Sequence, residues 1–132
     1  MMKKVRDVVS TAHAMVCVVD DDESVRDALP ILLGQFGLTA HAFASAEDFL
    51  SSDQADSADC LILDVAMPGI SGPELHARLK CSGNHGPVIF ITAHVDPSMR
   101  ARLLREGAVA CLCKPFSDTA LLEALHEALA AK

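Results

Sequence analysis

The chain of 132 residues contains no tyrosine, no tryptophan and only five phenylalanines. It also lacks any apolar run near the roughly 18 residues that span a membrane, so we expect no membrane contact. Positive charge is scarce, because 11 lysines and arginines stand against 18 aspartates and glutamates, which gives a net charge of −7. A surface with this charge repels phosphate backbones, and we therefore expect no direct nucleic-acid binding by the chain.

The five cysteines include no CxxC pair. An odd number of such thiols favours a reducing cytoplasm over a disulfide framework. Residues 1–13 carry three basic side chains but no unbroken apolar stretch, so they make a poor signal peptide. We interpret them as a flexible N-terminal extension of a single domain at residues 14–132. Four cysteines lie in apolar runs, where we expect small buried side chains: Cys17, Cys60, Cys111 and Cys113.

Short apolar runs alternate with amphipathic helical patterns along the domain. There are five such runs. One of them, Leu38–Phe43, has polar residues interleaved, which is typical of an edge strand. The alternation of strands and helices predicts a doubly wound α/β fold with five parallel strands. Four runs are apolar throughout, as expected for parallel strands covered on both faces: Ala14–Val19, Cys60–Leu63, Val88–Ile91 and Val109–Cys113.

The helical patterns have clear start and stop signals. Pro30 lies inside the first pattern and should kink the helix or loosen its first turns. The polar stretch Ser51–Asp59 is expected to be a surface connection. Predicted helix starts and ends are marked by polar caps and by glycines: Ser45, Ser71 with Glu74, and Asp96 with Pro97 at the starts, Gly37 and Gly107 at the ends.

Polar side chains follow the predicted strands at their carboxyl ends, which is the edge where open parallel sheets bind ligands. We expect them to form one site. They are Asp20–Glu23 after the first strand, Asp64 after the third, Thr92 and Ala93 after the fourth, and Lys114 and Pro115 after the fifth.

Carboxylates gathered this closely repel one another unless a cation joins them. Mg²⁺ is the natural choice, because it binds one or two carboxylates together with a phosphate. Asp64 would then be the nucleophile that accepts a phosphoryl group, with Thr92 and Lys114 holding its oxygens. Each residue alone also fits an ordinary role, such as a helix cap, and it is their joint placement that points to phosphoryl transfer.

Several segments resemble the receiver domains of two-component response regulators, over nearly the whole chain. Ala42–Leu50 is similar to the FixJ-like subgroup of nitrogen-fixation regulators. The resemblance implies a flavodoxin-like (βα)5 sheet with the strand order 2-1-3-4-5, which is known from a chemotaxis member of the family. The segments are Val18–Leu29, Leu61–Leu75, Val88–His94 and Cys111–Phe116.

The resemblance also implies a role for each matching residue. Asp64 corresponds to the phosphoacceptor, and the Lys114–Pro115 peptide bond corresponds to one that is cis in the family. Mg²⁺, or Mn²⁺ in its place, would be held by Asp20, Asp21, Asp64 and the main-chain carbonyl of Ala66. Phosphate binding and switching would fall to Thr92, Ala93 and Lys114.

Two features depart from the family pattern. Cys111 stands where the family has its switch aromatic, so we expect the response to run mainly through the loop after Thr92. Ala66 offers no side chain beside the phosphoryl site, and His94 is positioned to flank it. We expect these two positions to tune dephosphorylation.

As a receiver, the chain would be phosphorylated by a sensor histidine kinase and would then change a surface read by an output domain or effector protein, as in transcription regulation. A phosphorylation-dependent homodimer is one option. It would not be an enzyme and would assist only its own phosphorylation and dephosphorylation. Two alternatives remain: a metal-dependent phosphohydrolase with an aspartyl nucleophile, and a pseudo-receiver that acts only as an interaction module.

Overall fold

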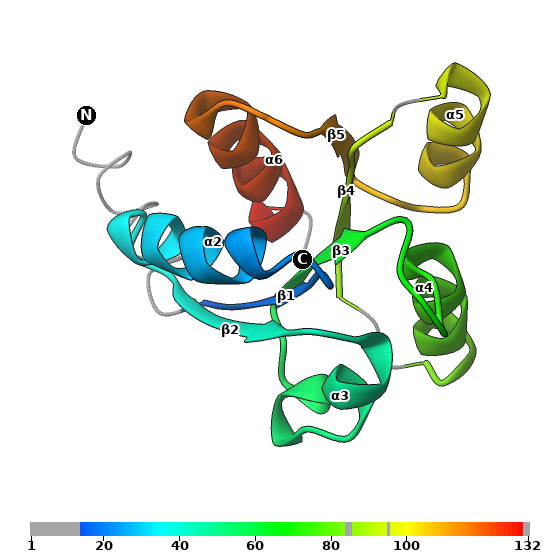
Figure 1. Cartoon of the computed structure of the whole chain (residues 1–132), viewed down its shortest axis with the longest axis horizontal. Helices are drawn as coiled ribbons and strands as arrows, with labels where there is room; N and C mark the ends of the chain where they lie inside the picture. Colours follow the sequence, from blue (N-terminus) through cyan, green and yellow to red (C-terminus); the bar gives the residue numbers. More distant parts are fainter. Residues whose placement is uncertain (1–13, 84–85, 95, 131–132) are drawn as a thin grey trace.

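The computed structural model describes residues 14–83, 86–94 and 96–130 (Figure 1). The predicted N-terminal extension at residues 1–13 lies outside these ranges. Five parallel strands form one sheet in the order β2-β1-β3-β4-β5, which confirms the predicted fold and strand order. The strands are β1 (Met15–Val19), β2 (Thr39–Phe43), β3 (Cys60–Asp64), β4 (Val88–Thr92) and β5 (Ala110–Cys113).

Helices cover both faces of this sheet (Figure 1). One face carries α2 (Glu23–Gln35) and α6 (Asp118–Ala130), and the other carries α3 (Ala46–Leu50), α4 (Gly72–Cys81) and α5 (Pro97–Arg105). Alternate residues of β1 supply the two cores, because successive strand side chains point to opposite faces. Val16 and Val18 pack toward α2 and α6, whereas Cys17 and Val19 pack toward α3, α4 and α5.

The predicted helix starts are confirmed by the capping contacts. Ser45, Ser71 and Asp96 each accept a main-chain N–H in the first turn of α3, α4 and α5. Glu74 forms only half of the expected capping box, because its carboxylate pairs with Arg78 at 3.2 Å. The helix α2 continues through Pro30 to its end at Gln35. The connection at residues 51–59 contains one short 3-10 helix, η1 (Asp53–Asp56), which the sequence pattern did not predict.

Three cysteines are buried as predicted, namely Cys17, Cys60 and Cys111, but the prediction for Cys113 is wrong. Cys113 is exposed, because it is the last residue of an edge strand and lies beyond the part of β5 that the helices cover. Its Sγ lies 3.5 Å from the main-chain oxygen of Lys114. Within the described ranges, no helix is long and apolar enough to cross a membrane.

Candidate functional site

Three carboxylates meet at the carboxyl ends of β1 and β3, which are neighbouring strands. Each of Asp20, Asp21 and Asp64 offers one oxygen, and these oxygens lie within 4.8 Å of one another. Asp20 is fully buried and Asp64 is only 5% exposed, whereas Asp21 is exposed. The predicted gathering of these acids is therefore present in the fold.

Lys114 reaches the same acids from the end of β5. Its Nζ lies 2.8 Å from Oδ2 of Asp20 and 3.7 Å from Oδ1 of Asp64, and its side chain is 19% exposed. The peptide bond between Lys114 and Pro115 is cis, as predicted. One ammonium thus contacts two of the three carboxylates, so the group keeps an excess of negative charge.

The environment of Asp64 favours its neutral form. Burial, followed by the charge of Asp20, raises the pKa of Asp64 to about 7, although Lys114 acts in the opposite direction. Burial lowers the pKa of Lys114, but its hydrogen bond to Asp20 and the nearby carboxylates outweigh this and leave the pKa above its ordinary value. Asp64 is thus a carboxylate whose charge a further cation would stabilise.

The donor set fits a hard divalent cation, because it consists of carboxylate oxygens held close together around a charge that one lysine leaves incompletely balanced. Ala66 lies in the loop after β3, two residues past Asp64, and is exposed. Gly72 holds this loop close to the strand. A Cβ there would collide with the main-chain oxygen of Asp64, so any side chain at Gly72 would push the loop away.

Thr92 is buried at the end of β4, but its hydroxyl is engaged by the loop that follows. The hydroxyl donates to the main-chain oxygen of His94 at 3.1 Å and accepts from the His94 N–H at 3.2 Å. The two contacts join the strand to the start of the β4–α5 loop. Asp96, which caps α5, follows His94 by two residues.

Cys111 is fully buried on β5, in the core formed with α4 and α5. Burial raises the pKa of the Cys111 thiol, and the charge of Arg100 on α5 lowers it. The predicted switch position therefore holds a small side chain that is already inside the core, with Leu103 of α5 in the same cluster.

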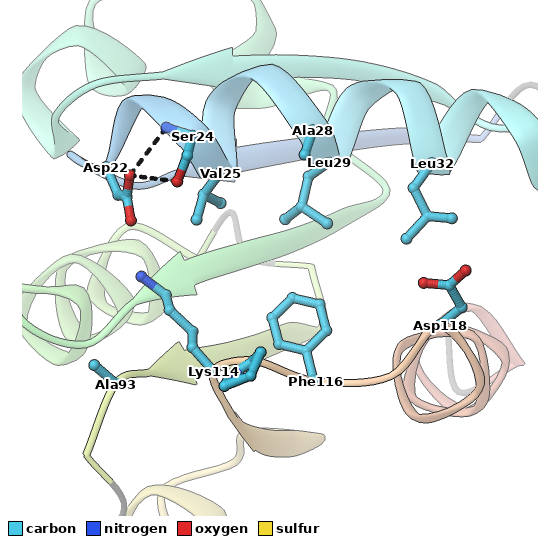
Figure 2. Close-up of a pocket in the computed structure, with 11 residues that line it drawn as sticks. Asp22, Ser24, Val25, Ala28, Leu29, Leu32, Ala93, Lys114, Phe116 and Asp118 are labelled. Carbon is cyan, nitrogen blue, oxygen red and sulfur yellow. Dashed lines mark hydrogen bonds between the residues drawn. The ribbon is translucent and has the colours of Figure 1, made fainter.

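An apolar groove of about 740 Å³ opens beside the site, between α2 and the segment that joins β5 to α6 (Figure 2). Figure 2 shows the amine of Lys114 and the carboxylate of Asp22 at one end of the groove and Asp118 at the other. Its walls are mainly apolar and are lined by Val25, Ala28, Leu29, Leu32, Pro115 and Phe116. Lys114 borders both this groove and the acidic site, and Ala93 lines the groove.

Two contacts at the site were not anticipated from the sequence. Arg26 donates from Nη1 to the main-chain oxygen of Asp20 at 3.1 Å, and Gly72 allows the close approach of the loop described above. Gly72 follows Ser71 at the predicted start of a helix, and a glycine at such a junction is a sequence feature that could have indicated the close approach of the loop. No sequence pattern predicted the contact of Arg26, because arginines in the first turns of a helix usually face solvent.

Comparisons with known proteins agree on one family. The family model described as "Response regulator receiver domain" matches residues 16–126. Nodulation protein W of Bradyrhizobium diazoefficiens is 43% identical over 116 residues, covering 88% of this chain and 51% of that protein. The transcriptional regulatory protein FixJ of Azorhizobium caulinodans is 40% identical over 114 residues, covering 86% and 54%.

A solved structure gives the same result at the level of the fold. The response regulator StyR superimposes with a TM-score of 0.82 at 42% identity, covering 91% of this chain and 61% of that chain. The chain spans about half the length of the curated relatives that it matches. These comparisons give no support to the phosphohydrolase or pseudo-receiver alternatives.

Proposed function

The chain belongs to the family of response regulator receiver domains, and from this premise we propose that Asp64 accepts a phosphoryl group from a sensor histidine kinase. The observation that carries the proposal is the joint contact of Lys114 with Asp20 and Asp64, beside the exposed Asp21. This arrangement surrounds one nucleophile with the charges that a phosphoryl group needs. We assign the receiver domain to residues 14–132.

In the transfer, a carboxylate oxygen of Asp64 attacks phosphorus and forms a P–O bond. The P–N bond to the donor histidine breaks, and the imidazole leaves with the electron pair and takes up a proton. Mg²⁺, held by Asp20, Asp21, Asp64 and the main-chain carbonyl of Ala66, supplies positive charge for the phosphoryl oxygens when it is bound. Mn²⁺ suits the same oxygen donors.

The remaining contacts would come from the strand ends. Lys114 exchanges part of its pairing with Asp64 for a phosphoryl oxygen, since its ammonium already lies at the edge of the site. The hydroxyl of Thr92, the last residue of β4, and the main-chain N–H of Ala93 would donate to another oxygen. The domain thus assists its own phosphorylation and hydrolysis and needs no second substrate.

Phosphate-affinity electrophoresis after incubation with acetyl phosphate tests the proposal. We expect a retarded band in the presence of Mg²⁺ that disappears when EDTA is added first. A band of equal intensity in EDTA would show that the acidic group does not work with a metal ion, and the proposed mechanism would fall.

The groove beside Lys114 is the surface that we assign to the kinase. The donor histidine must come within bonding distance of Asp64, and Lys114 both lines the apolar groove and contacts Asp64. Its acidic ends at Asp22 and Asp118 fit a partner segment that carries apolar side chains flanked by basic ones.

We expect Leu32→Asp to slow phosphotransfer from the kinase by about tenfold, because it places a charge in the apolar wall that the partner must desolvate. Labelling by acetyl phosphate should stay unchanged, since a small donor needs no groove. Leu104→Asp is the matched control, because Leu104 on α5 is 40% exposed and lies outside the groove. Equal rates of phosphotransfer from the kinase to the two variants would show that the groove is not part of the kinase interface.

His94 and Ala66 are the positions that we assign to the lifetime of the phosphorylated state. Both are exposed and lie two residues past Thr92 and Asp64, respectively, and in this proposal their side chains would border the path of an attacking water. We expect His94→Ala to change the decay rate by about threefold, which is about 0.7 kcal/mol in the barrier. The decay of labelled protein over time measures it, and an unchanged rate would exclude His94 from hydrolysis.

This chain spans about half the length of the two regulators that it matches. We propose that phosphorylation changes a surface that is read by an output domain or effector protein, or by a second copy in a homodimer. The described chain retains five free cysteines, which fits a cytoplasmic location.

A further inference from the structure

We propose that Arg26 is a positioning residue for the magnesium site. Its guanidinium would hold the main-chain carbonyl of Asp20, so that the side chains of Asp20 and Asp21 are aimed at one cation. This inference rests on the proposed function and deepens its metal site.

The first observation is where the Asp20 carbonyl lies. The N–H of Asp20 donates to the main-chain oxygen of Phe43 at 3.0 Å, which is the final contact between β1 and β2. The strand β2 ends at Phe43, so the carbonyl of Asp20 has left the sheet. Arg26 donates to that carbonyl from Nη1 at 3.1 Å, as a partner supplied from α2 in place of the sheet.

The second observation is that the side chain of Asp20 is held in place as well as its main chain. One carboxylate oxygen of Asp20, Oδ1, accepts the N–H of Asp22 at 2.9 Å. The other, Oδ2, lies 2.8 Å from Lys114. With Arg26 on the carbonyl, both the side chain and the following peptide bond of Asp20 have fixed directions. That peptide bond leads directly into Asp21, and its orientation determines where the Asp21 carboxylate points.

Asp21 needs such support more than its neighbours do. It is exposed, whereas Asp20 and Asp64 are buried, and its charge is repelled by both of them. A loop that can rotate about the peptide bond between Asp20 and Asp21 would let this carboxylate turn into solvent. The cation would then lose one ligand, or its binding free energy would be reduced by the cost of reordering the loop.

Because Arg26 is positively charged, the direction in which its removal changes the Mg²⁺ affinity distinguishes positioning of the loop from a purely electrostatic effect. A guanidinium near the acidic group opposes the arrival of a second cation, so its charge alone would weaken Mg²⁺ binding. If charge were its only effect, removal of Arg26 would tighten binding. If it positions the loop, removal weakens binding despite the loss of a repelling charge.

The test is the dissociation constant for Mg²⁺, taken from amide chemical shifts of Asp21 and Asp22 during a titration. We expect Arg26→Met, which keeps an apolar stem but has no donor, to bind Mg²⁺ about tenfold more weakly than wild type. Arg78→Met is the matched control, because it removes the same charge from an exposed pair with Glu74 on α4. We expect its Mg²⁺ affinity to stay close to that of wild type.

Binding by Arg26→Met that equals or exceeds the wild-type affinity would overturn the proposal. If that variant does not fold, Arg26→Gln decides by the same criterion, since its shorter amide does not reach the carbonyl. The titration needs no phosphoryl donor. Failure of wild-type labelling with acetyl phosphate would therefore count against the proposed function, and unchanged Mg²⁺ affinity would count only against Arg26.

Discussion

Asp64→Asn should lose phosphoryl uptake from acetyl phosphate by about a hundredfold or more, because an amide oxygen does not form a stable acyl phosphate. Asp20 is a neighbouring carboxylate, but it cannot readily replace Asp64 because it is fully buried and paired with Lys114 at 2.8 Å. The loss should appear in phosphate-affinity electrophoresis with Mg²⁺ present.

Asp22→Asn is the control for this experiment. Asp22 belongs to the same acidic run, yet its carboxylate caps α2 by accepting from the N–H and hydroxyl of Ser24. Asparagine caps a helix nearly as well, so labelling should persist. An Asp64→Asn protein that is labelled as strongly as wild type would show that another residue is the phosphoacceptor.

The same substitution should stabilise the magnesium-free protein, and the gain should depend on pH. The pKa of Asp64 is about 7 in the folded chain and near 3.8 when unfolded, since burial and Asp20 disfavour its charge. A raised pKa means that the folded state holds the proton more tightly. This contribution to stability is complete below pH 3.8 and is lost as the pH rises through 7.

We therefore expect the free energy of unfolding of Asp64→Asn to exceed that of wild type by on the order of 3 kcal/mol near pH 8 in EDTA. The difference should shrink as the pH falls toward 4. Urea unfolding at several pH values measures it, and added Mg²⁺ should raise the stability of wild type more than that of the variant. A difference that does not vary with pH would contradict this account of Asp64.

Asp22→Asn should behave in the opposite way. The side-chain and main-chain hydrogen bonds from Ser24 lower the pKa of Asp22, so its ionised form favours the folded state. That contribution is present above pH 3.8 and is lost as the pH falls through the lowered pKa. Loss of this charge should not stabilise the protein at neutral pH. The pH dependence of stability in the two variants thus distinguishes Asp64, which is buried, from Asp22, which is an exposed helix cap.

Most of the fold could be predicted because its signals are local. Apolar runs such as Val88–Ile91 became buried strands, and polar caps such as Ser71 and Asp96 began helices within a residue of the expected place. The gathering of Asp20 and Asp64 followed from topology, since parallel strands end at one edge.

The remaining features depend on tertiary position and side-chain direction. Cys113 has the same apolar neighbours as Cys111, yet the end of an edge strand leaves it uncovered. Spacing along the chain also says nothing about which way a hydroxyl or guanidinium turns. The bonds of Thr92 to the His94 main chain and of Arg26 to Asp20 were therefore visible only in three dimensions.

Under the proposed function, the Thr92 hydroxyl has to leave its two hydrogen bonds with the main chain of His94 before it can donate to a phosphoryl oxygen. Each is worth about 0.5–1.5 kcal/mol, so together they hold the hydroxyl against spontaneous release by about 1–3 kcal/mol. That preference keeps the released conformation about 5- to 150-fold less populated than the resting one. If release of this hydroxyl is the switching step, the unphosphorylated domain would give little basal response, and phosphorylation would have to supply that free energy before a partner responds.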